Sequence, residues 1–358
     1  MNRLTFTDHR RDPARWARLL NVPRAAVDLY LDCDVIDLHV DTFTWPRVFK
    51  RYDVTTRHRP WLPASAFLNQ VDLPRAREAH MAGMVWDIVT NPRRPPAERA
   101  RETLEHIAFI ERTLAAHPDD FAVVRSASEY RAVRQLGLTA SFVSLQGGQA
   151  VDVSLDAVMA LPDTVHRITI VHMTESRIGV PNTQPSRADV GLTEFGRDFV
   201  RCLVDKRILV DLSHINRAGF FDALSVMPKD VTPIVTHTGV CGVRPLWRNI
   251  DDAQLRAIAN RGGTVGIVFH PHFLADVVMT CSLSRIVDHM EHACKVVGDD
   301  FVSIGSDYDG LITLPRDLPD ITHQPRLVAE MLERGWSETR IRKILGGNAL
   351  RVIGAIRP

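Results

Sequence analysis

Short apolar runs alternate with longer amphipathic stretches along most of the 358-residue chain. Most of these runs are continuously apolar, which is typical of parallel strands with both faces buried. The pattern predicts eight strands: VIDLHV (35–40), GMVWDIV (83–89), SFVSLQ (141–146), HRITIV (166–171), ILVDLS (208–213), PIVTHT (233–238), GTVGIVF (263–269) and FVSIGS (301–306).

The stretches between the predicted strands carry apolar residues at helical spacing. They predict helices over 75–82, 96–117, 194–207, 252–262, 283–298 and 337–354. Thr193 is a good N-cap residue for the third of these helices, and Gly262 a typical stop for the fourth.

Eight strands that alternate with helices favour a (β/α)₈ barrel. We expect one barrel domain over 1–358, with a short helical extension at about 1–32. An open doubly wound sheet is the alternative. It is less favoured because no GxGxxG motif follows the first strand.

Composition narrows the range of partners. Lys and Arg number 44 against 43 Asp and Glu, so no net field favours nucleic acid or a membrane surface. No run approaches the roughly 18 apolar residues of a membrane span. The N-terminus is Arg-rich and lacks the apolar segment of a secretory signal. We therefore expect a small-molecule substrate.

The cysteines indicate a reducing compartment. They are odd in number and form no CxxC pair: Cys33, Cys202, Cys241, Cys281 and Cys294. With no secretory signal, this predicts reduced thiols in the cytoplasm. Most are expected to be small core residues. Cys241 follows His237 closely and is the one cysteine that could reach the pocket, although a place in the core is favoured for it too.

Histidines, carboxylates and amides gather where the predicted strands end. In a (β/α)₈ barrel, the carboxyl ends of the strands surround the active site. The residues at these ends are His39, Asp41, Gln146, Gln149, His172, His214, His237, His270, His272 and Asp307.

Two groups among these residues have the character of metal ligands. His39 and Asp41 stand two apart on a strand, so both side chains point the same way and can bind one divalent ion. His214 and His237 end consecutive strands, and neutral imidazole suits zinc. The alternative is that these are core histidines beside a helix-capping aspartate.

Asp307 ends the last strand in the motif GSDYDG. A carboxylate beside a metal can orient a water or carry a proton to a leaving amine. The alternative is a role in capping the turn, which fits Asp309 better.

Nine motifs occur in order from about residue 33 to 355: DLHVD, SLQGGQAVD, RITIVHMTES, GLTEFGRDFV, ILVDLSHIN, VTHTGV, RNIDDAQLRAI, VSIGSDYDG and KILGGNALRVI. Together they resemble the membrane (renal) dipeptidase family, which are zinc peptidases of the amidohydrolase superfamily. The resemblance implies a homodimer, and a hydroxide between two zinc ions that attacks the carbonyl of a dipeptide.

The resemblance also implies a role for each matching residue. His39 and Asp41 match the ligands of one zinc, and His214 and His237 those of the other. Asp307 matches the aspartate that assists proton transfer and faces the substrate amine. In WRNIDD, Arg248 matches the arginine that holds the substrate carboxylate, a task suited to its planar fork.

Two positions depart from the family pattern. Gln146 stands where the family has the glutamate that bridges the two metals, and Gln149 where it has the histidine that polarises the substrate carbonyl. A neutral amide leaves more of the charge on two Zn²⁺ ions uncompensated, a cost of several kcal/mol by Coulomb scaling. We expect one zinc ion, or two with the second weakly bound.

Other residues could replace the missing bridging carboxylate or add a metal ligand. Glu175 and Asp152 are the carboxylates that could replace the bridge, although neither ends a strand. His270 and His272 could add a ligand, but fit better as pocket-lining residues. Gln149 can still donate an N–H to the carbonyl oxygen. A lost donor of this kind commonly costs about 10²–10³ in rate.

The leading hypothesis is a dipeptidase-like metallohydrolase that cleaves an amide bond in a small carboxylate-bearing substrate. Two alternatives follow from the glutamines. The chain could be a repurposed tailoring enzyme that does not hydrolyse its substrate. It could also be a catalytically impaired relative that binds a small molecule, because a fold alone does not fix function.

Overall fold

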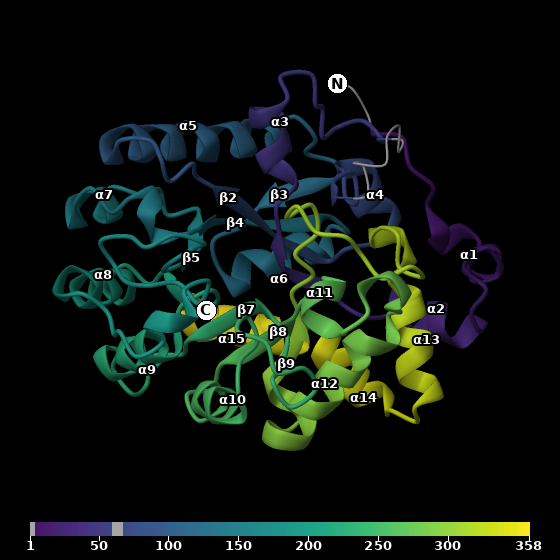
Figure 1. Ribbon diagram of the computed structural model, residues 1–358. Helices are drawn as coiled ribbons and strands as arrows, with labels where there is room; N and C mark the ends of the chain where they lie inside the picture. Colours follow the sequence, from purple (N-terminus) through teal and green to yellow (C-terminus); the bar gives the residue numbers. More distant parts are fainter. Residues whose placement is uncertain (1–3, 59–66) are drawn as a thin grey trace.

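A computed structural model of the protein describes residues 4–58 and 67–358. Eight parallel strands form a closed ring: β1 (Ile36–Val40), β2 (Gly83–Val89), β4 (Thr139–Gln146), β5 (Val165–Thr169), β6 (Leu209–Asp211), β7 (Ile234–Thr238), β8 (Thr264–Ile267) and β9 (Val302–Ile304). The ring closes where Asp37 pairs with Ile304. Helices surround it (Figure 1). The fold is the predicted (β/α)₈ barrel, and each predicted strand is present.

A ninth strand, β3 (Phe121–Val123), was not predicted. It pairs in parallel with the first residues of β4, beginning with Phe121 opposite Thr139. With three residues it is too short to show a pattern of its own. All eight residues of β4 are buried, as expected of a strand covered on both faces.

The main helices around the barrel are α3 (Trp45–Val48), α4 (Leu73–Glu78), α5 (Pro96–Ala115), α6 (Ala127–Gln135), α7 (Leu155–Met159), α8 (Glu194–Asp205), α9 (Arg217–Val226), α10 (Asp252–Ala259), α11 (Pro271–Leu274), α12 (Ser284–Val297), α13 (Pro325–Glu333), α14 (Glu338–Arg342) and α15 (Asn348–Ile356). Thr193 caps α8 as predicted, since its hydroxyl accepts a bond of 2.9 Å from Gly196 N. The helix predicted over 337–354 is interrupted by a π-helical segment at Lys343–Gly347.

The N-terminal extension is helical and packs on the barrel. It contains α1 (Pro13–Leu20) and α2 (Arg24–Leu31). Trp16 is buried against Tyr30, whose hydroxyl donates to Ala79 O at 2.7 Å. Arg326 donates to Leu20 O at 2.9 Å, which joins α13 to α1. Within the described residues, no helix is long and apolar enough to cross a membrane.

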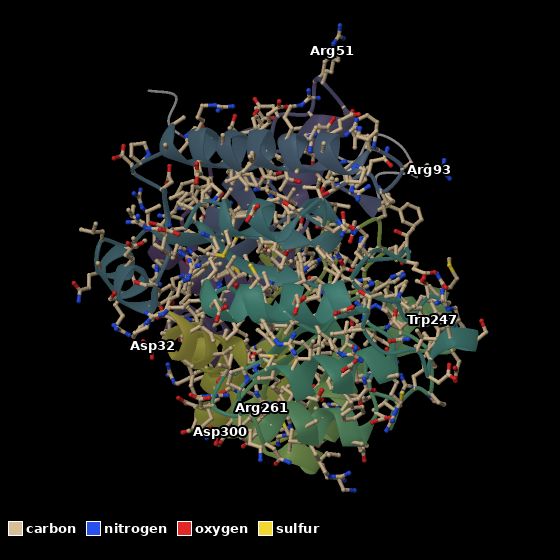
Figure 2. The ribbon with its side chains drawn as sticks, turned by 90° about the vertical axis from the view of Figure 1, so that its left-hand side faces the viewer. Asp32, Arg51, Arg93, Trp247, Arg261 and Asp300 are labelled. Atoms are coloured by element: carbon tan, nitrogen blue, oxygen red, sulfur yellow. The ribbon has the colours of Figure 1, made fainter. Side chains whose placement is uncertain are left out.

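The loops at the two ends of the barrel lie on opposite sides of the molecule. Figure 2 shows Arg93 and Trp247, from the loops after β2 and β7, on one side. Asp32 and Asp300, which precede β1 and β9, lie on the other. The side of Trp247 is the carboxyl end of the strands, where barrel active sites form.

Candidate metal centre

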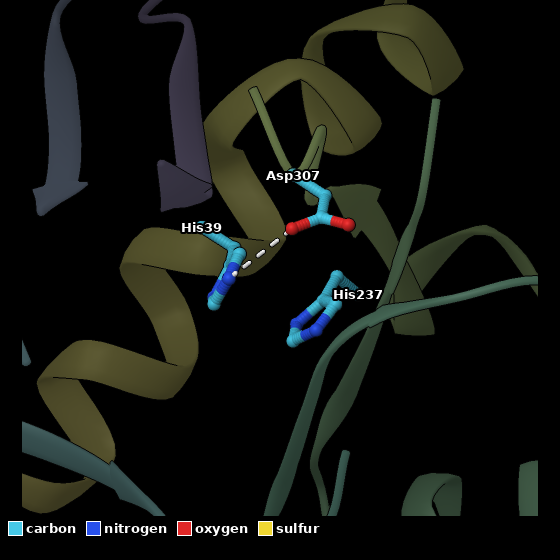
Figure 3. A group of neighbouring side chains, drawn as sticks. All are labelled: His39, His237 and Asp307. Carbon is cyan, nitrogen blue, oxygen red and sulfur yellow. Dashed lines mark ion pairs between the residues drawn. The ribbon is translucent and has the colours of Figure 1, made fainter. Parts of the chain in front are cut away.

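The end of β1 and the turn after β9 bring three of the predicted residues together. His39 Nε2 lies 3.5 Å from Asp41 Oδ2. It also lies 3.5 Å from Asp307 Oδ1, the ion pair drawn in Figure 3. A Cβ atom at Gly310 would touch Asp307 Oδ1 and would lie 2.9 Å from Asp41 Oδ2. Both carboxylates therefore face the same small space. We call His39, Asp41 and Asp307 the carboxylate half of the site.

His214 and His237 form the opposite part, which we call the imidazole half. Their Nε2 atoms lie 2.7 Å apart, and the His237 ring stacks on that of His39 with centroids 3.7 Å apart. Burial lowers the pKa of both rings well below the usual value, and the Arg248 cation lowers them further. Both rings are therefore neutral at neutral pH, the form that binds metals.

The donor atoms of this cluster fit a divalent ion. His39, His237 and Asp307 each offer a ligand atom within 4.8 Å of the others. Among the described residues, His39 Nε2 and Asp41 Oδ1 have no hydrogen-bond partner although both are buried. Buried polar atoms are rarely unsatisfied, and imidazole and carboxylate are the ligands that zinc takes. The residues predicted as ligands thus converge on one site.

Two of the site residues have a backbone conformation that is rare outside glycine. His214 has φ 66° and Asp307 has φ 65°. Such conformations cost free energy and are common at functional sites. Each residue lies in the turn three residues beyond the end of its strand, His214 after β6 and Asp307 after β9.

Gln146 ends β4 and faces the imidazole half. Its Nε2 atom lies 3.4 Å from His237 Nε2. Gly147 follows with φ 114°, a conformation that only glycine adopts readily. Gln149 is buried beside Gly147, and neither of its amide atoms has a partner among the described residues.

A cavity of about 320 Å³ opens over the site. Gln146, Asp307 and His214 lie in its wall, and Trp45 and Phe273 give it an apolar outer part. The other lining residues are Asp41, Thr44, Val89, His172, Met173, His270, Asp309, Gly310, Leu311 and Ile312. Gln149 and His272 do not line it.

His172 is a site residue to which the sequence assigned no role. It lines the cavity, and its ring lies 4.6 Å from that of His214. Burial lowers its pKa to about 3, and the nearby His39 adds to this effect. The signal in the sequence was its place at the end of the strand HRITIV.

Asp307, within the cluster, and Arg248, beside it, are two ionisable groups whose pKa values are shifted by burial. Burial raises the pKa of Asp307 to about 8, because the Asp41 carboxylate adds to it and His39 only partly offsets it. Arg248 is 1% exposed and donates to His237 O at 2.8 Å. Burial lowers the Arg248 pKa to about 10, so the guanidinium stays charged at neutral pH.

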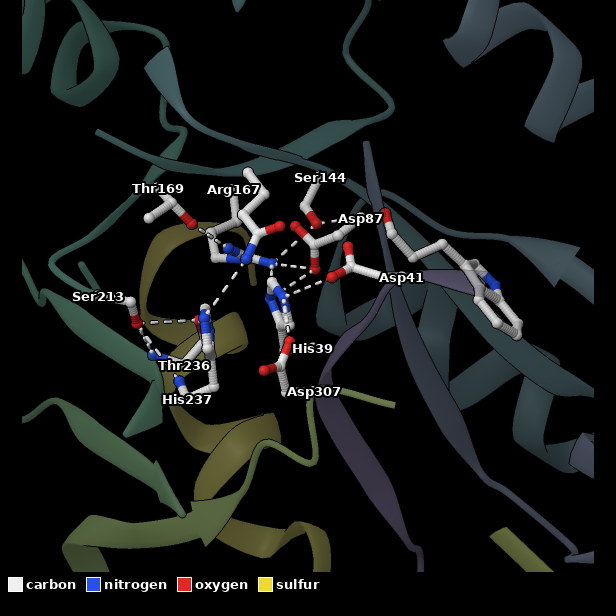
Figure 4. A network of polar contacts seen from close by, with 12 residues as sticks. His39, Asp41, Asp87, Ser144, Arg167, Thr169, Ser213, Thr236, His237 and Asp307 are labelled. Carbon is white, nitrogen blue, oxygen red and sulfur yellow. Dashed lines mark hydrogen bonds and ion pairs between the residues drawn. The ribbon is translucent and has the colours of Figure 1, made fainter. Parts of the chain in front are cut away.

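A buried polar network lies beneath the cluster (Figure 4). His39 Nδ1 lies 2.9 Å from Asp87 Oδ2, and Arg167 pairs with both Asp87 and Asp211. Burial would lower the pKa of His39, but Asp87 and Asp41 together raise it to about 10. A carboxylate on the second ring nitrogen is the usual support of a metal-binding histidine.

Neither Asp152 nor Glu175 is free to replace the bridging carboxylate. Asp152 pairs with Arg99 at 2.6 Å, and Glu175 pairs with Arg187 at the surface. Cys241 does not line the cavity over the site; it lines a second cavity, of about 360 Å³, with Sγ 3.3 Å from Asn249 O.

Comparison with known proteins places this geometry in a family. The family model for membrane dipeptidases, peptidase family M19, matches residues 24–357. The solved structure of dipeptidase AC, a metallopeptidase of family M19, is 28% identical, with 90% of this chain and 99% of that chain covered and a TM-score of 0.77.

Two further structures are similar. A metallopeptidase from Rhodobacter sphaeroides, liganded with a phosphinate mimic of the dipeptide L-Ala-D-Ala, is 26% identical over 90% of this chain and 98% of that chain, with a TM-score of 0.77. An amidohydrolase from Pseudomonas aeruginosa, at 19% identity, 92% and 98% coverage and a TM-score of 0.76, supports the fold alone.

Proposed function

Because the chain belongs to the membrane dipeptidase family, we propose that it cleaves the amide bond of a dipeptide or a dipeptide-like substrate. Family membership makes it a metal-dependent hydrolase of the dipeptidase type. The observation that carries the proposal is the convergence of His39, His237 and Asp307 on one space, beside a cavity and the buried cation of Arg248.

We assign one metal position to His39 and Asp41 and a second to His214 and His237, and propose zinc because neutral imidazole and carboxylate are its usual ligands. When bound, the ion supplies Lewis acidity and an acidified water. Gln146 brings no negative charge to the place where the family has its bridging glutamate. We therefore propose one tightly bound ion, with a second bound weakly.

The charged groups orient the substrate. A carboxylate fits the planar fork of Arg248, and an amine fits Asp307. The Asp307 carboxylate can take a proton from the attacking water and pass it to the leaving amine nitrogen. These two groups select a small molecule with a carboxylate and an amine.

Two residues are candidates for the donor to the scissile carbonyl. Gln149 was predicted for this role; its amide has no partner among the described residues, but it does not line the cavity. His172 is neutral, lines the cavity and can donate one ring N–H. Gln149→Ala and His172→Ala separate them, because loss of the true donor lowers kcat by about 10²–10³.

The second candidate function is a tailoring reaction without hydrolysis. It is favoured by Gln146 and Gln149, two neutral buried amides in a site where the resemblance implies a glutamate and a histidine. A small-molecule substrate, a homodimer and a cytoplasmic location remain predictions.

The test is release of free amino acids from a panel of dipeptides by the zinc-loaded protein. We expect hydrolysis, with a loss of at least about 100-fold in Asp307→Asn, the size of an acid–base contribution. Asp276→Asn is the control, since Asp276 is 95% exposed. Saturable binding that depends on Arg248, with no hydrolysis of any dipeptide, would replace this proposal with the tailoring function.

A further inference from the structure

The turn after β9 has a strained backbone. Asp307, Asp309 and Leu311 adopt left-handed conformations, with φ 65°, 62° and 61°. Outside glycine such conformations cost free energy, and they persist only where the surrounding structure holds them. Three alternate residues of one short turn share this strain, so contacts from outside the turn must oppose its relaxation.

The Asp307 carboxylate rests on this turn. A Cβ atom at Gly310 would touch Asp307 Oδ1, so the carboxylate lies directly against the Gly310 backbone. Gly310 N also donates to Asp307 O at 3.1 Å. On its other side, Asp307 Oδ1 lies 3.5 Å from His39 Nε2 (Figure 3). A shift of the turn would therefore move the carboxylate relative to His39.

Asp309 anchors the turn to two other segments. It is 1% exposed, and its carboxylate accepts bonds from Thr42 Oγ1 at 2.6 Å, Gln70 N at 2.8 Å and Val71 N at 3.3 Å. Its backbone N–H donates to Gln70 Oε1 at 2.8 Å, and its carbonyl accepts from Trp45 Nε1 at 2.9 Å. These bonds join the turn to the segment after β1 and to the segment before α4.

The carboxylate of Asp309 is directed to the protein. Asp309 borders the cavity over the site, but Oδ1 accepts from Gln70 N, and Oδ2 accepts from Thr42 and Val71. Both oxygens are thus occupied by donors from neighbouring segments. This pattern favours a role in holding the turn over direct contact with a substrate.

We propose that Asp309 is a positioning residue, which holds the strained turn and so keeps the Asp307 carboxylate in place at the metal centre. The inference rests on the proposed function, in which Asp307 belongs to that centre. It extends the turn-capping role expected from the sequence, because the position of Asp307 depends on the cap. Asp309 then acts on the metal only through Asp307.

A double-mutant cycle on zinc affinity tests this dependence. The affinity of the tightly bound ion is measured by chelator competition in Asp309→Asn, in Asp307→Asn and in the double variant. We expect Asp309→Asn to weaken binding by about 10–100-fold, the size of an outer-shell change. The double variant should bind no more weakly than Asp307→Asn. Losses that multiply in the double variant would overturn the inference, because they are the mark of independent sites.

Thr42→Val separates the bond from the charge. It removes the hydroxyl that donates to Asp309 and leaves the Asp309 carboxylate in place, so zinc affinity should fall about tenfold, the size of one hydrogen bond. Unchanged affinity would overturn the inference. Asp222→Asn is the matched control, because Asp222 also accepts from a backbone N–H, that of Leu192 at 2.9 Å, and lines neither cavity.

Relief of the backbone strain provides a rescue. The Leu311 side chain is 66% exposed, so Leu311→Gly removes the cost of a positive φ with little loss of packing. In the Asp309→Asn background it should recover part of the lost zinc affinity, and in the wild-type background it should change little. Absence of recovery would show that Asp309 does not oppose this strain, and the inference would fail.

The outcomes separate this inference from the hydrolase proposal. If the zinc losses do not multiply and wild-type protein cleaves no dipeptide, the positioning role stands and hydrolysis fails. If wild-type protein cleaves dipeptides and the zinc losses multiply, hydrolysis stands and the positioning role fails.

Discussion

The two halves of the metal centre differ in charge and in support. In the carboxylate half, His39 has Asp41 and Asp307 within 3.5 Å and Asp87 on its other nitrogen. In the imidazole half, no ion pair among the described residues joins His214 or His237 to a carboxylate. Beside these two rings lie the neutral amide of Gln146 and the buried cation of Arg248, and Asp307 offers a ligand atom within 4.8 Å of one on His237.

This difference predicts that the two halves bind a metal ion with unequal affinity. A divalent ion gains most where negative charge is close and buried, because a low local dielectric strengthens the interaction. The carboxylate half meets that condition. The imidazole half depends on a charge from the bridging position, and Gln146 does not provide it. We therefore expect one strong and one weak position for a metal ion.

Substitution of a metal ligand should give the largest difference in zinc affinity between the two halves. His39→Ala should abolish tight binding of the first ion, a loss beyond the roughly 10–100-fold of an outer-shell change. His214→Ala should leave a first ion bound in the carboxylate half. Zinc affinity measured by competition with a chelator decides this. Equal losses in the two variants would remove the distinction between the halves.

A carboxylate restored at residue 146 should make the two halves more alike in metal affinity. Gln146→Glu adds a carboxylate beside His237 and should strengthen second-ion binding by several kcal/mol, which is at least about 100-fold. Zinc titration followed by calorimetry would show a second tight step. Gln184→Glu is the control, because Gln184 lies in the second cavity. No second step in Gln146→Glu would show that residue 146 does not lie between two metal positions.

Loss of the Asp87 charge beneath His39 should lower metal affinity less than loss of a ligand does. Asp87→Asn keeps the shape of the side chain and removes its charge, so first-ion affinity should fall by about 10–100-fold. Second-ion affinity in a Gln146→Glu background should change little. Thermal unfolding of the metal-free variant serves as a control for folding. An unchanged first-ion affinity would mean that Asp87 is only a packing partner of Arg167.

The smallest effect expected is a pH dependence confined to the carboxylate half. The pKa of His39 is raised to about 10 and that of Asp307 to about 8, so both hold protons at neutral pH without metal. Ion binding must displace the His39 proton, so first-ion affinity should rise with pH. The slope is about tenfold per unit for each proton released. Chelator competition between about pH 6 and 7.5 measures it, and a flat profile would contradict it.

Much of the barrel could be predicted because its signals are local. Apolar runs marked the eight strands, and Thr193 marked the start of α8. Strand β3 could not be predicted, because three residues are too few to show an alternation of apolar and polar positions. The π-helical break at Lys343–Gly347 depends on packing around it, which the sequence pattern does not show.

The candidate site could be predicted where a predicted strand ends in a residue that commonly binds metals, as at His39, His214 and His237. The network beneath it was not. Asp87, Arg167 and Asp211 appear in the sequence as single charges inside apolar strands. Their meaning depends on which strands neighbour one another around the ring, and that arrangement brings them together.

The most direct test of the two unequal halves is the zinc content per chain of wild-type protein purified without chelators, measured by elemental analysis. We expect one tightly held ion per chain, with a second that is lost on dialysis. Two ions that survive dialysis equally would contradict it. Such a result would show that Gln146 does not weaken the second position.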